Sequence, residues 1–406
     1  MASLSRRTLL GAAGAAAAGA LTACSGSSHS RHPAAAPPGG DAAGTPTVRR
    51  LIGDGSTADT GPQPLQPSLP PLERGQRPPQ FVVFSWDGAG EIGTGLFARF
   101  RKLAAEHGAT MTFFLSGLYC LPEDKKDLYR PPNNPVGASA IGYLTDEHIK
   151  MTLQQVRAAW LEGHEIGTHF NGHFCDGSGS VANWTSADWD SELRQAVDFV
   201  THWRTNTGFT DVDPLPFDYT RELVGARTPC LLGQQQWLPT AKAHGFRYDA
   251  SNPGGLQIWP AKLQGLWNFP LQNMPFPGHR FEVLSMDYNI LANQSHNATK
   301  SDPANYPGWR QQATDSYIAG FQRAYTTNRA PFFIGNHLET WNGGIYMDAV
   351  EEALKHVAAA GDDVHMVSFR QLADWLDHQD PALLATLRTL PVGRAPADGW
   401  KAFTSA

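Results

Sequence analysis

The sequence predicts an α/β protein with a single, mainly parallel β-sheet. From about residue 81 to residue 376, short apolar runs alternate with amphipathic segments. The runs are rich in β-branched and aromatic residues, which is typical of buried strands. Strand–helix alternation over about 300 residues indicates one α/β domain. A closed barrel and an open, doubly wound sheet both satisfy this pattern.

Eight strands and six helices are expected in order along this domain. The strands cover residues 81–86, 110–115, 164–168, 223–226, 246–248, 281–285, 331–335 and 364–367. The helices cover residues 146–161, 185–204, 233–244, 313–327, 346–360 and 369–376. Thr145 is the expected N-cap of the first helix, and Thr185 with Asp188 resembles a capping box for the second. No glycine-rich phosphate loop follows the first strand, which argues against a nucleotide fold.

The N-terminus has the pattern of an export signal. Arg6 and Arg7 precede an Ala/Gly/Leu-rich stretch that reaches Ala23 and is too short to span a bilayer convincingly. The paired arginines resemble a twin-arginine signal. Leu21 to Cys24 resembles a lipobox, which implies cleavage before Cys24 and its acylation. A signal peptide with an incidental cysteine is the alternative. We therefore expect a lipoprotein anchored to the outer face of the cytoplasmic membrane.

The sequence divides into four regions. Residues 1–23 are the expected signal peptide, and residues 24–79 form a tether rich in Pro, Gly, Ala and Ser. Such a segment has too few large apolar residues to offset its ordering entropy. Residues 80–378 form the predicted domain, and residues 379–406 form a tail without a motif.

Composition narrows the choice of partners. The chain has 32 Lys and Arg residues against 38 Asp and Glu residues, and it has no basic run. Nucleic acid is therefore an unexpected partner, and no protein partner is indicated. Export permits a disulfide. Of Cys120, Cys175 and Cys230, the last two lie close to polar motifs, so they are the favoured pair, with one thiol left over.

The most informative motif is a pair of histidines four residues apart. His169 and His173 follow the predicted strand 164–168 and can face one point from a single turn. Neutral imidazole is the commonest protein ligand for a transition metal. Asp87, Arg227, Asp249 and His337 also lie just after predicted strands, where parallel α/β folds place their chemistry. The sequence therefore predicts a site at this edge of the sheet.

These motifs together resemble the polysaccharide deacetylases of carbohydrate esterase family 4, the NodB homology domain. The resemblance covers about residues 81–376. Three stretches, residues 245–251, 265–270 and 328–331, are similar to the animal-type chitin deacetylase branch. The resemblance implies a distorted (β/α)7 barrel and a divalent metal, usually zinc, with cobalt or another first-row ion as alternatives.

The resemblance also assigns roles to residues. The family's first motif is Thr-Phe-Asp-Asp-Gly, whose first Asp is the general base and whose second binds the metal. Aligned with residues 84–88, it makes Asp87 a metal ligand beside His169 and His173. Arg227 then orients the base, Asp249 supports the acid histidine, and His337 is the general acid. The implied reaction is the hydrolysis of acetyl groups from N-acetylated sugars of an extracellular chitin-like or peptidoglycan-like glycan.

In this alignment Trp86 stands where the family has its base. Loss of a general base costs roughly 10²- to 10⁴-fold in rate. Glu91 is the first candidate for a substitute base, followed by Asp176 and Glu339. Arg227, without its usual anionic partner, is expected to face another carboxylate or a wet pocket. The alternatives to an enzyme are a non-catalytic glycan-binding protein and, from a different class, the solute-binding lipoprotein of a transporter, which would show two lobes.

Overall fold

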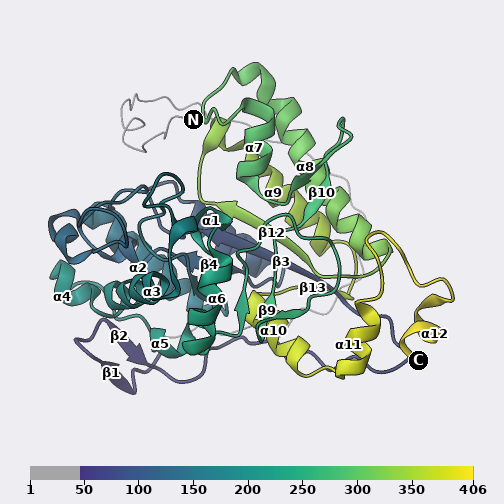
Figure 1. Ribbon diagram of the computed structural model, residues 1–406, viewed down its shortest axis with the longest axis horizontal. Coiled ribbons are helices and arrows are strands. Elements are labelled where there is room, and N and C mark those ends of the chain that lie inside the picture. Colours follow the sequence, from purple (N-terminus) through teal and green to yellow (C-terminus); the bar gives the residue numbers. More distant parts are fainter. Residues whose placement is uncertain (1–45, 406) are drawn as a thin grey trace, which may run out of the picture.

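A computed structural model of the chain describes residues 46–405 and has one large curled sheet at its centre (Figure 1). The signal peptide, Cys24 and the first part of the expected tether lie outside the described residues. The order along the sheet is β12-β3-β4-β5-β6-β7-β9-β8, and β13 also pairs with β3. The strands are β3 (Gln80–Asp87), β4 (Thr112–Leu115), β5 (Glu165–Thr168), β6 (Gly225–Ala226), β7 (Tyr248–Asp249), β8 (Lys262–Leu263), β9 (Leu266–Asn268), β12 (Phe332–His337) and β13 (Val364–Met366).

The pairing is parallel throughout, apart from the antiparallel pair β8–β9 at one edge. The mixed α/β class, the mainly parallel sheet and the curled, barrel-type arrangement predicted from the sequence are confirmed. The predicted strand 281–285 is the exception, because β11 (Glu282–Leu284) pairs with β10 (Asn273–Pro275) in a separate two-stranded sheet. A further small sheet joins β1 (Arg50–Ile52) to β2 (Thr57–Asp59).

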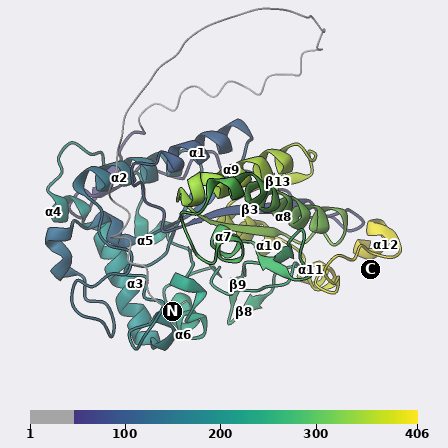
Figure 2. The same ribbon diagram turned by 90° about the horizontal axis from the view of Figure 1, so that it is seen from above.

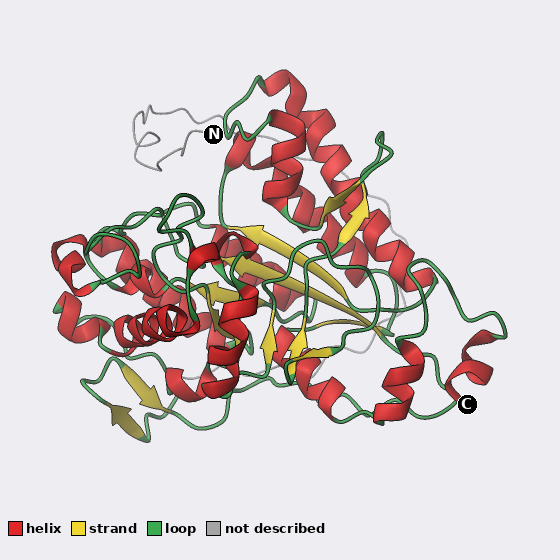
Figure 3. Cartoon of the chain, viewed as in Figure 1, coloured by secondary structure: helices red, strands yellow, loops and turns green. Residues whose placement is uncertain are grey.

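Helices surround the sheet, as the secondary-structure colouring shows (Figure 3). Seen from above, α1 and α9 lie on one side of β3, and α6 lies on the other (Figure 2). The α-helices are α1 (Leu96–Glu106), α2 (Asp146–Leu161), α3 (Ser186–Thr201), α4 (Trp203–Thr207), α5 (Tyr219–Glu222), α6 (Gln234–Ala243), α7 (Asp287–Ser295), α8 (Tyr306–Thr326), α9 (Trp341–Ala358), α10 (Phe369–Asp377), α11 (Pro381–Leu387) and α12 (Gly399–Ser405). No helix among residues 46–405 has the length and apolar character that a membrane crossing needs.

The predicted caps explain where two of these helices begin. The Thr145 side chain accepts a hydrogen bond from the backbone N–H of His148 at the start of α2. Thr185 and Asp188 form the reciprocal capping box of α3. Each satisfies backbone donors that the first helical turn leaves without a partner.

Two segments expected to lie outside the domain pack against it. Ala58 donates a backbone hydrogen bond to the carbonyl of Leu215, and the Trp203 indole donates to the carbonyl of Ser56. Ser56 and Ala58, which belong to the expected tether, are therefore bound to the domain by specific polar contacts. In the C-terminal segment, α11 buries Leu383, Leu384 and Leu387 in the core.

The two faces of the sheet pack into different cores. Val82, Phe84 and Trp86 of β3 belong to the cluster shared with the surrounding helices. The intervening residues Phe81 and Val83 belong to a second cluster. Because successive side chains of a strand point to opposite faces, Ser85 and Asp87 lie on the side of the second cluster.

Candidate active site

The predicted site residues lie at the carboxyl ends of strands in one sheet. Asp87 ends β3 and His337 ends β12, and the two are register partners. His169 directly follows β5, Arg227 follows β6, and Asp249 ends β7. All five strands belong to the same sheet, which places these residues along one edge. Ligands and chemistry gather at this edge in parallel α/β folds.

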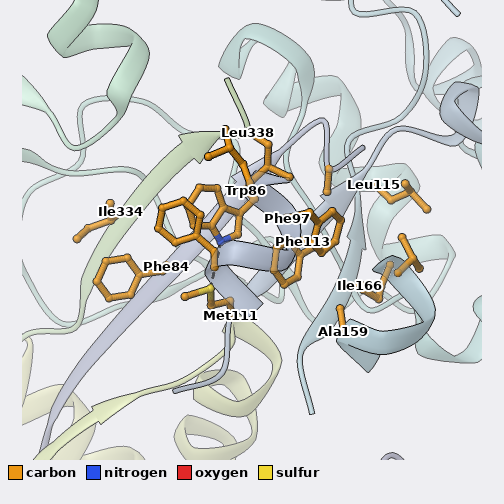
Figure 4. Close-up of a cluster of buried hydrophobic side chains, with 14 of the residues drawn as sticks. Phe84, Trp86, Phe97, Met111, Phe113, Leu115, Ala159, Ile166, Ile334 and Leu338 are labelled. Atoms are coloured by element: carbon orange, nitrogen blue, oxygen red, sulfur yellow. Dashed lines mark hydrogen bonds between the residues drawn. The ribbon is translucent and has the colours of Figure 1, made fainter. Parts of the chain in front are cut away.

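Trp86 lies in the cluster of buried hydrophobic side chains that the sheet shares with the surrounding helices, beside Met111 (Figure 4). Its ring lies 4.2 Å from that of Phe100 on α1, centroid to centroid, and its indole N–H contacts the sulfur of Met111 at 3.3 Å. The side chain is fully buried. Trp86 therefore has a packing role and does not occupy the place of a catalytic base.

Asp87 forms a buried ion pair with Arg227. The guanidinium Nη1 donates to Asp87 Oδ1 at 2.7 Å and to the Ser85 hydroxyl at 2.9 Å. Both charged side chains are nearly inaccessible, with exposures of 0% and 3%. Burial alone would raise the pKa of Asp87, but the charges of Arg227, His169 and His337 outweigh it, and the pKa is lowered. Arg227 thus has the carboxylate partner expected for it.

The identity of that partner changes the alignment of the first motif. In the family resemblance, Arg227 orients the general base, and the side chain that it holds is Asp87. A shift of one residue accounts for this, with Asp87 at the base position and Trp86 at the preceding aromatic position. Gly88 then falls where the second, metal-binding Asp would be. A Cβ atom built on Gly88 would lie 3.8 Å from the Ser116 and Tyr119 hydroxyls, so this point faces the site.

His337 is supported by Asp287. The imidazole Nδ1 lies 2.8 Å from Asp287 Oδ1, and the backbone N–H of His337 donates to Oδ2 of the same carboxylate at 2.7 Å. Burial favours neutral imidazole, but the charge of Asp287 and its hydrogen bond prevail and raise the pKa of His337 above 6.5. Asp287 is fully buried and directs the opposite ring nitrogen, Nε2, away from itself.

The assignment of Asp249 as the supporting carboxylate is therefore wrong. Asp249 instead accepts hydrogen bonds from Gln234 at 2.6 Å and from the Ser251 hydroxyl at 2.7 Å. Burial is the main influence on this carboxyl and raises its pKa. Sequence reasoning missed Asp287, although it follows the predicted strand 281–285 and so carried the same signal as the other strand-end residues.

The histidine pair lies beside the ion pair. His169 is buried, and its Nδ1 lies 2.8 Å from the carbonyl oxygen of Arg227. Burial lowers its pKa to about 4, so the ring is neutral at pH 7 and its Nε2 is free of a proton. A backbone carbonyl on the opposite nitrogen is the usual support of a metal-binding histidine. The rings of His169 and His173 are 5.1 Å apart, centroid to centroid.

The predicted Asp–His–His metal group is not assembled as expected. Within residues 46–405, one group of three potential ligands has donor atoms within 4.8 Å of one another, and it consists of His173, Cys175 and Cys230. Asp87 is turned toward Arg227. His169 is therefore suitably placed to bind a metal, whereas Asp87, the expected third ligand, is paired with Arg227. The metal site stays a prediction.

The favoured disulfide is confirmed. Cys175 and Cys230 are bonded, with Cα atoms 5.8 Å apart, and this bond joins the segment after His173 to the segment after Arg227. Among residues 46–405, Cys120 is the remaining thiol, and it is buried. Burial raises its pKa to about 12, which leaves it unreactive at neutral pH.

The three candidate substitute bases lie in different surroundings. Glu91 is buried and accepts a hydrogen bond from the backbone N–H of Gly95, so it holds its own loop. Asp176 is exposed. Glu339 lines a small hollow together with Asp87 and His337, on the side of Tyr119. A larger hollow beside Glu123 and Thr145 contains none of the site residues.

Aromatic side chains flank His337. Trp341 lies 5.2 Å from the His337 ring and Tyr288 lies 6.5 Å from it, centroid to centroid. Tyr288 is 44% exposed. Exposed aromatic faces next to a polar centre suit the apolar face of a sugar ring, although neither residue was singled out from the sequence.

Comparison with known proteins gives structural resemblances only. No protein-family profile matches the chain. No curated protein matches it. A Mycobacterium smegmatis protein described as a candidate polysaccharide deacetylase is 15% identical, with a TM-score of 0.44, over 76% of this chain and 94% of that one. A Bacillus subtilis peptidoglycan deacetylase is 9% identical, with a TM-score of 0.38, over 74% of this chain and 92% of that one.

A Bacillus anthracis pseudoenzyme of carbohydrate esterase family 4 is also similar. It is 11% identical, with a TM-score of 0.38, over 76% of this chain and 70% of that one. Because these identities are so low, the function is inferred from the side chains of the site.

Proposed function

We propose that the chain is a hydrolase that removes acetyl groups from N-acetylated sugars of a glycan. The observation that carries this proposal is the juxtaposition of Asp87 and His337 as register partners on β3 and β12. Each has its own charged support, Arg227 for the carboxylate and Asp287 for the imidazole. The two supports favour opposite protonation states, which is how an acid and a base are kept apart in one site.

The reaction follows from these two groups. Asp87 accepts a proton from a water molecule while the water oxygen attacks the acetyl carbonyl carbon. The carbon–nitrogen bond of the tetrahedral intermediate then breaks, and protonated His337 gives its proton to the departing amine. The products are acetate and a free amino sugar. A divalent metal on His169 and His173, which remains part of the proposal, would polarise the acetyl carbonyl.

A glycan is favoured as substrate because Tyr288 and Trp341 stand beside His337. The resemblance of the sequence motifs to polysaccharide deacetylases supports the same class. We extend the proposal to location, namely a lipid-anchored protein outside the cytoplasm, on the basis of the N-terminal sequence pattern.

A non-catalytic glycan-binding protein is the second candidate, and Gly88 favours it. With a glycine where the family has a second aspartate, the site lacks one carboxylate. A solute-binding protein is disfavoured, because one large sheet, and not two lobes, organises the described residues.

Acetate release separates the candidates. The full chain is incubated with chitin oligomers and with peptidoglycan, with and without added zinc or cobalt. The enzyme proposal expects release that falls by roughly 10²- to 10⁴-fold in Asp87→Asn and in His337→Ala. Trp86→Phe is the matched control and keeps activity. Absence of release from every glycan, with sugar still bound, contradicts the enzyme and supports the binding protein.

A further inference from the structure

His173, Cys175 and Cys230 form a compact group of sulfur and nitrogen donors, and the proposed reaction uses neither of the two cysteines. The Nδ1 atom of His173 lies 3.5 Å from the sulfur of Cys175 and 3.7 Å from the sulfur of Cys230. All three residues are partly exposed. The imidazole thus faces both ends of the disulfide at once.

These separations match those of a tetrahedral metal site. Zinc binds thiolate sulfur at about 2.3 Å and imidazole nitrogen at about 2.0–2.1 Å. At tetrahedral angles, a nitrogen and a sulfur bound to one zinc ion are therefore about 3.6 Å apart, and two sulfurs about 3.8 Å apart. The two observed nitrogen–sulfur distances, 3.5 and 3.7 Å, are close to the first of these values. Only the two sulfurs must move apart.

The backbone holds the three residues in place from two adjacent strands. His173 and Cys175 follow β5, and Cys230 follows β6, which is the parallel neighbour of β5. His173 and Cys230 both have φ near +60°, a left-handed conformation that is uncommon outside glycine. Such positions persist where the surrounding structure fixes them. The donors therefore lie in the loop that follows β5 and in the short turn that follows β6.

We propose that this group is a redox-gated metal site, which binds a thiophilic divalent ion such as zinc once the disulfide is reduced. A dithiol supplies two electrons and two protons, the Cys175–Cys230 bond breaks to give two thiols, and the dithiol becomes a disulfide. Metal binding then releases the two thiol protons. His173 contributes neutral nitrogen, and the fourth position is open to solvent. A small-molecule disulfide reverses the step: it takes two electrons from the thiolates and two protons from water and becomes a dithiol, the Cys175–Cys230 bond re-forms, and the ion is released.

The test uses the full chain and cobalt as the metal probe. The chain is reduced with a phosphine, which is oxidised to its oxide and, unlike a thiol, does not compete for the metal. Cobalt is added to the reduced and to the oxidised protein. We expect thiolate-to-cobalt charge-transfer absorption that saturates at one ion per reduced chain. This band should be absent from the oxidised chain, where cobalt bound at the His169 site has no thiolate ligand.

Variants locate the ligands. The double variant Cys175→Ser/Cys230→Ser should lose the absorption, and His173→Ala should shift the visible bands and weaken binding. Cys120→Ser is the matched control and should keep the full signal. His169→Ala should also keep it, which distinguishes this site from a metal at the proposed active site, where the same substitution removes a ligand.

Three results of the cobalt titrations overturn the proposal. They are the absence of charge-transfer absorption in the reduced wild-type chain, absorption that survives the double variant, and absorption that depends on Cys120. Circular dichroism of the reduced chain accompanies each titration. Loss of the fold on reduction also overturns the proposal, because the site requires the β5 and β6 segments to stay in register.

Discussion

Asp87 and His337 lie opposite each other on adjacent parallel strands, and their surroundings favour opposite charges. Arg227 holds the pKa of Asp87 down against the effect of burial, and Asp287 raises the pKa of His337 against the same effect. A carboxylate and an imidazolium therefore coexist at pH values between the pKa of Asp87 and the pKa of His337. A proton acceptor and a proton donor are thus ready at the same time.

This pair predicts a bell-shaped dependence of kcat/KM on pH. Activity rises as Asp87 ionises below its usual range, and it falls as His337 loses its proton above pH 6.5. In Asp287→Asn the imidazole loses its anionic partner, so the alkaline limb should move to lower pH. The measurement is the pH–rate profile of both proteins, and an unchanged alkaline limb would show that another group titrates there.

The position of Trp86 predicts that it cannot be turned into a base. Trp86→Asp places a charge in the buried hydrophobic cluster, against Phe100 and Met111. Truncation of a buried Trp typically costs about 3–5 kcal/mol, and the buried charge adds to that. We expect an unfolded or strongly destabilised chain in thermal and urea unfolding. A stable variant with higher acetate release would return Trp86 to the active site.

The ion pair of Asp87 with Arg227 predicts strong coupling between the two. Arg227→Met leaves a buried carboxylate without its partner, which should cost about 3–5 kcal/mol of unfolding free energy. Adding Asp87→Asn to this variant should restore much of that loss. Urea unfolding of the two single variants and the double variant measures the coupling. Additive effects would mean that the pair does not interact energetically.

Gly88 predicts a gain on substitution. Its φ of +61° is one that Asp tolerates better than most residues, and a Cβ atom there makes only ordinary contacts. Gly88→Asp should bind cobalt at the His169 site at least about tenfold more tightly, a difference of about 1.4 kcal/mol. Calorimetric titration of the oxidised chain measures this, with Gly88→Asn as the uncharged control. Equal affinity in all three proteins would indicate that position 88 does not face the metal.

Glu192 predicts a pH effect on stability that is separate from catalysis. This buried carboxyl accepts hydrogen bonds from the Tyr129 hydroxyl. The hydroxyl oxygen in turn accepts a hydrogen bond from the backbone N–H of Gly172, which lies between the two histidines in the sequence. Burial raises the pKa of Glu192 from 4.5 to about 7. Between pH 4.5 and about 7, the folded chain holds a proton on Glu192 that the unfolded chain releases. The contribution of Glu192 to the free energy of unfolding is therefore fully present below pH 4.5 and is lost as the pH rises through about 7.

The loss from Glu192 amounts to up to about 3 kcal/mol of unfolding free energy. Glu192→Gln keeps an acceptor for Tyr129 and should remove this component. Urea unfolding at pH 5 and pH 7.5 compares the two proteins. A wild-type chain whose dependence on pH equals that of Glu192→Gln would contradict the assignment.

Much of this arrangement could be predicted from residue patterns. The strand of residues 81–86, the caps Thr145 and Thr185, and the strand-end positions of His169, Arg227 and His337 follow from local periodicity and chemistry. The Cys175–Cys230 bond followed from proximity to the same motifs. In each case the signal lies within a few residues of the feature it predicts.

The remaining features depend on contacts between distant segments. Whether Trp86 or Asp87 faces the site is decided by which face of β3 meets α1, and Arg227 lies 140 residues away from the carboxylate that it pairs with. The choice between Asp249 and Asp287 depends on which loop reaches β12. Residues 46–79 look like a linker in composition, and their order comes from hydrogen bonds to residues more than 100 positions away.

The alternation along β3 has a practical consequence for engineering. Neighbouring positions of β3 affect two different properties, because alternate side chains face the helix layer and the candidate site. Substitutions at Val82, Phe84 and Trp86 can be selected for thermal resistance without touching the reacting groups. Ser85 and Asp87 both accept hydrogen bonds from Arg227, so substitutions there change the candidate site and leave the helix layer in place. A library that varies both sets together would mix the two outcomes, whereas one that varies every second residue would keep them apart.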